Sequence, residues 1–419
     1  MHRREIIKLL AASSVLAGCA STPPSTPAGR VVVVGGGYGG ATAATFIRRW
    51  SPELEVLLID RNPDFVSCPL SNLVLAGNLS LEEITVPYRG LRDRGVQVIR
   101  DEVIGIDVAR RKLRLSRLEE LGYDRLVLSP GVDFMTGQIS GLDSAQARAR
   151  VLHAWKAGPE TLALRRQLME MRDGGVYVLA IPPVPFRCPP APYERACQVA
   201  HFFRHAKPKS KVIILDANED IASEKAIFTR AWNELYKGMI EYRNNSEVRE
   251  VDASTLTAKL DFDTVRADVL NVLPPMKAAG VAEAAGLVTA NGRWCEVDWL
   301  TMESVAAPGV HILGDATLSA PLMPKSGHMA NQQGKHAAAA IAALTRGEAP
   351  ERESIMISSC YSFVDPASAA HVVTVHKYDA EARTFKVVPG SAGVSAAANQ
   401  LDGRYAFAWA RNIWNEMLG

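Results

Sequence analysis

The sequence predicts an α/β protein with two Rossmann-like βαβ units, the second inserted into the first, followed by a C-terminal α+β region. Three apolar runs support this prediction, because a buried parallel strand reads as a continuous stretch of β-branched and aliphatic residues. Residues 30–34 precede a glycine-rich turn, residues 176–181 open a second strand–turn–helix–strand series, and residues 309–316 return to a buried strand late in the chain. At 419 residues the chain is long enough for two or three domains.

The turn after the first strand has the spacing of a dinucleotide-binding loop. Gly35, Gly37 and Gly40 fit the pattern G-x-G-x-x-G. In this pattern the first glycine permits a tight turn, the second lets the backbone approach a pyrophosphate, and the third lets the helix pack on the strand. A helix expected over residues 41–49 directs its N-terminal N–H groups at the phosphates. We therefore predict that this unit binds a dinucleotide.

Two further segments complete this first site. An apolar strand at residues 55–59 ends at Asp60, where an acid accepts a hydrogen bond from a ribose hydroxyl, and Arg61 follows it. Residues 123–131 read as a buried strand that ends in Gly131, the usual third contact in flavoproteins with two dinucleotide units. We assign Asp60, Arg61 and Gly131 to the cofactor site. An ordinary α/β domain with a glycine-rich turn is the alternative, which the order of strand, helix and acid disfavours.

The second unit has the architecture of a nucleotide domain without its phosphate loop. Strand 176–181, a helix at about 193–205 and strand 211–215, ending at Asp216, repeat the βαβ plan. The turn at residues 182–192 contains prolines where a nicotinamide site needs glycines. Prolines lack the N–H groups that would hold a pyrophosphate. We predict that NAD(P)H does not bind here.

The chain then returns to the first domain. Residues 309–316 form a strand that ends in Gly-Asp, and in FAD enzymes of the glutathione reductase type that aspartate, here Asp315, holds the ribitol of the flavin. A turn aspartate is the alternative. An Ala-rich helix follows Lys325 and runs to about residue 344, and its N-terminus would stabilise negative charge on a reduced flavin. The predicted cofactor is therefore FAD, and no metal site is predicted.

The predicted organisation has four parts. They are an export signal and linker at 1–29, a discontinuous FAD-binding domain at 30–145 and 271–345, a second Rossmann-like domain lacking the NAD phosphate loop at 146–270, and a C-terminal interface domain at 346–419. Strands are expected at 371–375 and 384–388, and a last helix carries an apolar stripe at Phe407, Ala410, Ile413, Trp414 and Met417. Packing of this stripe on the body and contact with a membrane both stay open.

The N-terminal segment reads as a targeting signal. Arg3-Arg4 precede an apolar stretch at 6–16 and resemble a twin-arginine signal, which exports proteins already folded around a cofactor. Leu16-Ala17-Gly18-Cys19 resembles a bacterial lipobox, in which Cys19 would carry a lipid anchor; cleavage elsewhere to a soluble product is the alternative. We predict a periplasmic protein. The formal net charge of +2 is accounted for by the first 19 residues, which gives no support for nucleic-acid binding.

The cysteines suggest redox chemistry without settling it. Six are present, at Cys19, Cys68, Cys188, Cys197, Cys295 and Cys360. Without Cys19 the number is odd, so at least one thiol of an exported protein has another task. No C-x-x-C-H occurs, which excludes a c-type haem attached to this chain. Cys188 and Cys360 would form a redox-active disulfide if they met over the flavin, whereas buried free cysteines commonly act as small hydrophobes. Cys197 and Cys295 are interpreted as inert core thiols.

The sequence resembles a known family, the flavoprotein subunit of flavocytochrome c sulfide dehydrogenase, which is related to the sulfide:quinone oxidoreductases. The resemblance covers almost the whole mature chain. Its most specific segment is the unusual proline–cysteine run at 185–195. The other matching segments are Thr42-Ala43-Ala44, residues 153–158, Met323-Pro324-Lys325-Ser326-Gly327, and Ser359-Cys360-Tyr361-Ser362.

The resemblance implies roles for individual residues. Cys68 stands where the family attaches FAD covalently through a thioether, although Pro69 replaces the expected aromatic neighbour. Cys188 and Cys360 stand at the two positions of the active disulfide, and Glu194 at that of a nearby carboxylate with an acid–base role. The implied substrate is hydrogen sulfide, and the implied partner is a separate c-type cytochrome subunit in a heterodimer.

Three other functions stay open. A sulfide:quinone oxidoreductase shares the disulfide and flavin but reduces membrane quinone. The last helix suits a protein interface better, because polar residues stand among its apolar positions: Arg404, Arg411, Asn412, Asn415 and Glu416. A lipid at Cys19 would favour quinone reduction, because it would hold the enzyme near a membrane. A non-catalytic flavoprotein would leave its flavin oxidised when sulfide is added. An NADH-dependent disulfide reductase is disfavoured by the proline turn.

Overall fold

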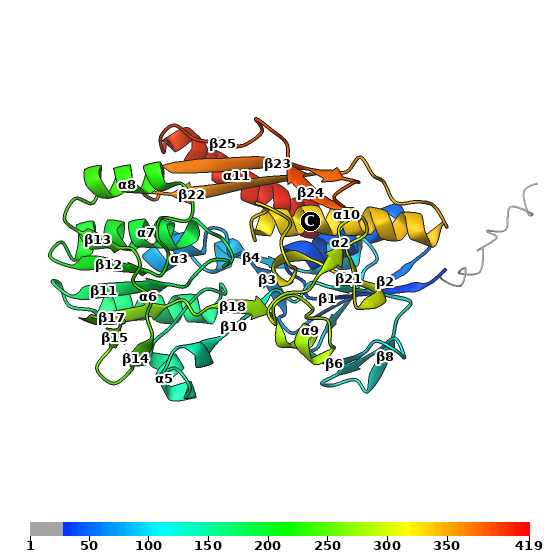
Figure 1. The fold of residues 1–419 in the computed structure, drawn as a ribbon, viewed down its shortest axis with the longest axis horizontal. Coiled ribbons are helices and arrows are strands. Elements are labelled where there is room, and N and C mark those ends of the chain that lie inside the picture. The colour runs from blue at the N-terminus through cyan, green and yellow to red at the C-terminus, as the bar shows by residue number, and fades with distance from the viewer. Residues whose placement is uncertain (1–27) are drawn as a thin grey trace, which may run out of the picture.

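The computed structural model describes residues 28–419. The predicted twin-arginine signal, the lipobox at Cys19 and most of the predicted linker lie outside the described residues. Two α/β domains lie side by side along the long axis of the molecule, and the C-terminal strands extend across one side of both (Figure 1).

The first domain is built on a seven-stranded sheet. In spatial order its strands are β19 (Val297–Asp298), β20 (Glu303–Ser304), β21 (Ala307–Ile312), β9 (Arg125–Leu128), β1 (Arg30–Val34), β2 (Glu55–Asp60) and β5 (Gln97–Arg100). The five strands from β21 to β5 are parallel, and the interior of β1 is fully buried, as its run of valines predicts. The sheet thus joins chain segments from both parts of the predicted FAD-binding domain.

Two helices lie beside this sheet, one packed on the sheet and the second packed on the first. Helix α2 (Tyr38–Trp50) begins directly after Gly37, and helix α10 (Gly327–Thr345) packs against it. Their approach depends on small residues: a Cβ on Gly334 would lie 2.5 Å from the carbonyl oxygen of Gly39. The Ala-rich composition of the second helix therefore serves close helix packing.

The second domain holds a parallel four-stranded sheet in the order β13 (Ile240–Arg243), β12 (Lys211–Asp216), β11 (Val176–Ile181) and β17 (Val269–Val272). Helices α6 (Pro159–Glu170), α7 (Ala191–Ala206) and α8 (Lys225–Glu234) belong to this domain. Strand β17 pairs with β11 up to Val272, opposite Ala180, so the sheet extends two residues past the boundary expected at 270.

The C-terminal region forms an antiparallel sheet with one long helix. Its elements are β22 (Ile355–Phe363), β23 (Ala369–Asp379), β24 (Thr384–Val387), β25 (Gly393–Val394) and α11 (Gln400–Leu418). The apolar stripe of α11 packs on the body: Ala410, Ile413, Trp414 and Met417 are buried, and Phe407 lies edge-on to Phe363. Within residues 28–419 no helix has the length and apolar character needed to cross a bilayer.

Shorter elements connect these layers. The remaining strands are β3 (Asp64–Val66) with β4 (Thr85–Pro87), β6 (Val103–Asp107) with β7 (Lys112–Leu115) and β8 (Glu120–Gly122), β10 (Val132–Phe134) with β18 (Met276–Ala278), and β14 (Glu250–Asp252) with β15 (Thr257–Lys259) and β16 (Thr264–Arg266). The remaining helices are α3 (Ser71–Ala76), α4 (Arg89–Asp93), α5 (Ala145–Arg150), α9 (Gly280–Ala284) and the 3-10 turns η1 (Glu82–Ile84), η2 (Thr136–Gln138) and η3 (Gly314–Ala316).

Candidate active site

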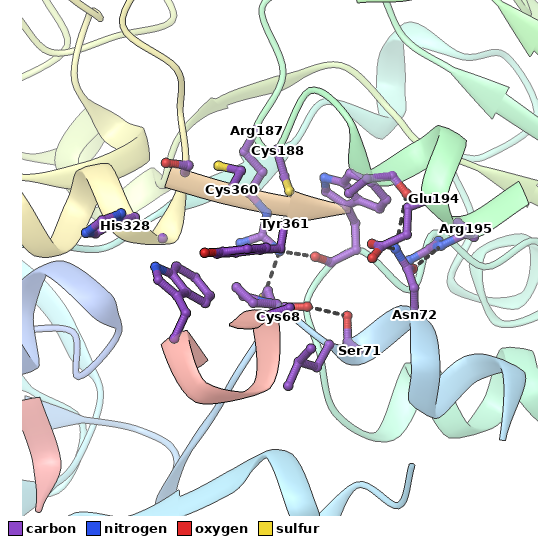
Figure 2. A pocket seen from close by; sticks show the side chains of 18 residues that line it. Cys68, Ser71, Asn72, Arg187, Cys188, Glu194, Arg195, His328, Cys360 and Tyr361 are labelled. Atoms are coloured by element: carbon purple, nitrogen blue, oxygen red, sulfur yellow. Dashed lines mark hydrogen bonds between the residues drawn. The ribbon is translucent and has the colours of Figure 1, made fainter. Parts of the chain in front are cut away.

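A cavity lies where both domains and the C-terminal region meet, and three of the cysteines line it. Cys68 comes from the first domain, Cys188 from the proline turn of the second, and Cys360 from β22 (Figure 2). The cavity is further lined by Pro69, Leu70, Ser71, Asn72, Trp155, Arg187, Ala191, Glu194, Arg195, Ser326, Gly327, His328, Tyr361, Ala406 and Trp409. Segments from Cys68 to Trp409, 341 residues apart in sequence, therefore share one site.

The backbone fixes the positions of the two cysteines that the family resemblance pairs. Cys360 lies within β22, opposite Val372 of β23. Cys188 has a φ of 57°, in the left-handed region, and its N–H donates to the carbonyl oxygen of Lys325 at 2.7 Å. A non-glycine residue in this region is strained, and such strain is concentrated at functional sites. All five cysteines within residues 28–419 are free in this structure.

Burial controls the acidity of both thiols. The pKa of Cys188 is raised well above its usual value, mainly by burial and then by the nearby Cys360 and Glu194, while Arg187 acts in the opposite direction. Burial raises the pKa of Cys360 to about 11, although hydrogen bonds from Ser326 and Ser358 favour its thiolate. Cys360 raises the pKa of Cys188, and Glu194 raises the pKa of both thiols, so the two sulfurs share a carboxyl neighbour.

Glu194 stands in the first turn of α7 and faces the same cavity. Its Oε2 accepts a hydrogen bond from Asn72 Nδ2 at 2.7 Å, and its Oε1 accepts one from the backbone N–H of Phe363 at 3.0 Å. Burial raises the pKa of this carboxyl to about 7, even though these hydrogen bonds and Arg195 favour the anion. Glu194 can therefore exchange protons near neutral pH, which the predicted acid–base role requires.

Cys68 stands next to a buried cation. Arg187 Nη2 donates to Cys68 Sγ at 3.0 Å and also to the carbonyl oxygen of Trp155. The carbonyl oxygen of Cys68 accepts hydrogen bonds from the N–H of Ser71 at 3.0 Å and from its hydroxyl at 2.6 Å, at the start of α3. Backbone and guanidinium together fix where this sulfur points.

The glycine loop has the shape that a dinucleotide requires. Gly35 has a φ of 96°, and a Cβ there would lie 2.3 Å from the carbonyl oxygen of Ser129; a Cβ on Gly40 would lie 1.9 Å from that of Gly35. By contrast, a Cβ on Gly37 or Gly131 would meet no atom within 4 Å, so the backbone there faces open space. The loop is closed where strand and helix must touch and open where a pyrophosphate would lie.

Two of the other predicted cofactor residues fit FAD in different ways. Asp315 Oδ1 is buried without a hydrogen-bond partner in the structure, which suits a ribityl hydroxyl. Asp60 accepts the N–H of Gly36 at 2.6 Å, the N–H of Asn62 at 2.7 Å and the side-chain amide of Asn62 at 3.0 Å, and it stays partly exposed at the end of β2.

Arg61 and Lys325 do not line the cavity. Arg61 is exposed and pairs with Glu102 at 3.2 Å. The Lys325 ammonium donates to the carbonyl oxygens of Asp315 and Thr317 and lies 3.8 Å from the centre of the Trp294 ring. Burial lowers its pKa to about 8. Ser326, Gly327 and His328, at the beginning of α10, do line the cavity.

Comparisons with known proteins identify the family. Three family models match consecutive parts of the chain: pyridine nucleotide-disulphide oxidoreductase at residues 29–167, the central part of the sulfide dehydrogenase [flavocytochrome c] flavoprotein chain at 161–274, and the flavocytochrome c sulphide dehydrogenase flavin-binding region at 352–418. The flavoprotein chain of this enzyme from Chlorobaculum thiosulfatiphilum is 51% identical over 45 residues, which is 94% of that sequence and 11% of this one. The chain belongs to the flavocytochrome c sulfide dehydrogenase flavoprotein family. This confirms the predicted family and the enzyme class, an FAD-dependent sulfide oxidoreductase.

More distant relatives agree with the fold. Mouse mitochondrial sulfide:quinone oxidoreductase is 25% identical over 297 residues, 68% of this chain and 65% of that enzyme, just under two thirds of its length. The solved sulfide:quinone oxidoreductase of Aquifex aeolicus superposes with a TM-score of 0.76 at 18% identity, covering 93% of this chain and 91% of that one. Putidaredoxin reductase gives a TM-score of 0.66 at 17% identity, over 93% of each chain. The predicted glutathione reductase type of fold is confirmed.

Sequence reasoning missed several residues of the site in this flavoprotein. Asn72 and Arg195 hold the Glu194 region: Arg195 donates to Asn72 Oδ1 at 3.0 Å and lies over the Trp155 ring at 4.8 Å. Glu224, in the loop before α8, is buried and hydrogen bonds to Ser362. Arg187 and Arg195 belong to the segment that carried the family resemblance, which was the available signal; Glu224 lies in a polar stretch that reads as a surface loop.

Proposed function

We propose that this flavoprotein oxidises sulfide through a redox-active disulfide between Cys188 and Cys360, passes the electrons to FAD, and delivers them to a c-type cytochrome. The observation that carries the proposal is the shared cavity: both thiols line it, together with Cys68 and a carboxyl whose pKa is about 7. A disulfide beside a flavin can take part in thiol–disulfide exchange with an incoming sulfur nucleophile.

The sulfur chemistry balances over one cycle. Hydrosulfide attacks one sulfur of the oxidised pair, forming a persulfide on that cysteine and releasing the other as a thiolate. A second hydrosulfide then takes the outer sulfur as a disulfane anion and leaves two reduced cysteines. The disulfide re-forms when the pair gives up two electrons. In total, two hydrosulfides become one disulfane anion and one proton, and two electrons leave.

We assign attack to Cys188 and departure to Cys360. A thiolate leaves faster when its pKa is lower. Serine hydroxyls stabilise the Cys360 thiolate, whereas Cys188 has a pKa raised well above its usual value. Glu194, with a pKa of about 7, accepts the proton that sulfide brings into the cavity.

The residues that would hold FAD are the Gly35–Gly37–Gly40 loop and Gly131 for the pyrophosphate region, Asp60 for the ribose and Asp315 for the ribityl chain. When bound, FAD supplies the two-electron acceptor for the dithiol and passes electrons on singly. Cys68 lines the same cavity, and we propose that it carries the covalent thioether bond to the flavin. Arg61 and Lys325 stay proposed cofactor contacts. Lys325 would act by holding the carbonyl oxygens of Asp315 and Thr317.

The proposed acceptor is a cytochrome subunit in a periplasmic heterodimer. Strand β22, which carries Cys360, also presents Ile355 and Ile357 with 56% and 42% of their surfaces exposed, which supports a protein partner on this strand. Export by the twin-arginine route and a lipid at Cys19 are part of the same proposal, on sequence grounds alone.

The test is anaerobic addition of sulfide to the purified protein. We expect the flavin absorbance to bleach and added cytochrome c to be reduced, while a soluble quinone analogue is not. Fast quinone reduction without cytochrome reduction would favour a sulfide:quinone oxidoreductase. Bleaching of the flavin by NADH alone would favour a disulfide reductase. A flavin that stays oxidised after sulfide is added would refute sulfide oxidation. Denaturation followed by mass measurement should find flavin on the peptide that contains Cys68; flavin that washes away refutes the covalent bond.

A further inference from the structure

A second buried carboxyl lies beside the thiol pair and has no role in the scheme above. Glu224 immediately precedes α8, in a left-handed conformation with a φ of 54°. Its side chain is buried, with 8% of the residue surface exposed, although the next residue, Lys225, is exposed and pairs with Asp220 at the surface. In Figure 1 the beginning of α8 lies beside the C-terminal sheet that contains β22. Glu224 is therefore a buried carboxyl whose neighbour in the chain reaches the surface.

Its contacts connect it to the strand of Cys360. The hydroxyl of Ser362 donates to Glu224 Oε2 at 2.6 Å. Ser362 follows Cys360 by two residues in β22, so the two side chains point to the same face of the sheet. Glu194 bonds to the N–H of the next residue, Phe363. Two buried carboxyls thus hold consecutive residues of the strand that carries the reactive sulfur.

The two carboxyls differ in their free oxygens. Both oxygens of Glu194 accept hydrogen bonds, which favour its anion. Glu224 Oε1 is buried and has no hydrogen-bond partner in the structure. An unpaired carboxylate oxygen in an apolar setting is costly, and protonation removes that cost. Among titratable groups, Glu194 of α7 acts on both Glu224 and Cys360, and Glu224 acts on Cys360.

We propose that Glu224 is a second proton carrier of this site, which takes up the proton released in each sulfide cycle and passes it to solvent at the beginning of α8. The inference rests on the proposed function, whose balance releases one proton for every electron pair. Glu224 Oε1 accepts that proton, and its deprotonation to surface water restores the anion. Burial raises the pKa of Glu224 to about 8, which suits exchange in both directions near neutral pH. Glu224 does not touch substrate, so its role is to move protons for the cysteine pair.

The test compares Glu224→Gln with the control Glu234→Gln, an exposed carboxyl at the other end of the same helix. Anaerobic stopped-flow bleaching of the flavin by sulfide is measured over a pH series. We expect Glu224→Gln to slow bleaching about tenfold, a small part of the usual contribution of a proton-transfer group, and to lose the wild-type inflection near pH 8. The control should keep the wild-type profile. Ser362→Ala, which removes the contact and keeps the carboxyl, should lower the rate in the same direction.

A second readout is independent of turnover. In the reduced protein, the pH midpoint for alkylation of Cys360, followed by peptide mass, should fall in Glu224→Gln because a nearby negative charge is removed. Wild-type pH profiles and alkylation midpoints in both Glu224→Gln and Ser362→Ala would overturn the proposal. If sulfide does not bleach the flavin of the wild-type protein, the proposed function is refuted instead. The alkylation midpoint does not depend on turnover, so an unchanged Cys360 midpoint in Glu224→Gln would by itself overturn the link between Glu224 and Cys360.

Discussion

The two βαβ units have the same architecture but differ in the turn after the first strand and in the acid that ends the second. In the first, the turn after β1 is glycine-rich, Gly37 faces open space, and Asp60 stays half-buried. In the second, the turn after β11 is proline-rich, and Asp216 at the end of β12 is fully buried.

The fate of the two acids explains the difference. Asp216 accepts hydrogen bonds from Tyr193 at 2.7 Å, from Tyr242 at 3.1 Å, and from both nitrogens of Asn218. Its carboxylate is satisfied by the protein, so none of it is offered to a ribose. In the second unit the loop instead lines the cavity with Arg187 and Cys188, and the first turn of α7 adds Glu194. A shared fold therefore fixes where a loop lies, while the residues of the loop decide what it does.

The largest expected effect concerns Cys188, in the loop of the second unit, and Cys360, in β22. Replacing Cys188 or Cys360 with serine should lower the rate of flavin bleaching by sulfide about a thousandfold or more, because the exchange step loses its sulfur. Flavin content should not change. Stopped-flow absorbance measures the rate, and Cys197→Ala, at a buried thiol on α7 away from the cavity lining, serves as the control. Equal rates in the serine variants and wild type would remove the second loop from catalysis.

The next effect breaks the first unit. Gly40→Val should abolish FAD binding, because a Cβ at Gly40 would lie 1.9 Å from the carbonyl oxygen of Gly35. The flavin-to-protein absorbance ratio after purification measures the loss, and overpacking at such a site costs on the order of 1–3 kcal/mol in unfolding free energy. The control Pro183→Gly, in the proline turn of the second unit, should retain its full flavin content. Flavin retention by Gly40→Val would show that this loop does not hold the cofactor.

The acids of the two units should respond differently. Asp216→Ala should lower the free energy of unfolding by about 1–3 kcal/mol, since it leaves buried tyrosine hydroxyls without an acceptor, and should leave FAD binding unchanged. Asp60→Ala should weaken FAD binding. Denaturant titration and flavin titration of the apoprotein separate the two outcomes. A loss of flavin affinity in Asp216→Ala would contradict the distinction between the units.

The smallest effect is a pH dependence of stability. Glu194 has a pKa raised to about 7, so the folded state binds more protons than the unfolded state between the ordinary glutamate pKa, about 4.3, and 7. Stability must then fall as pH rises through this window and level off above it. Glu194→Gln should flatten this part of the profile, measured by urea titration at a series of pH values. An unchanged slope would mean that Glu194 titrates normally.

Much of the fold was predictable because it depends on local patterns. Strand β1 and strand β11 match their expected ranges, and the Ala-rich helix extends only one residue past its expected end. Strand β22, which carries Cys360, was not anticipated. Its sequence has no regular alternation of polar and apolar residues, so a strand is not predicted from it. Pairing with β23 decides its structure.

The sequence by itself determined the glycine loop, the proline turn of the second unit, and the cysteines of the family motif, because these depend on residue type and spacing along the chain. Only the tertiary structure decided which groups meet: the shared cavity, the raised pKa of Glu194 and the burial of Glu224. Burial and long-range contact depend on how the two domains and the C-terminal sheet pack, and a one-dimensional pattern does not encode the electrostatic environment that this packing creates.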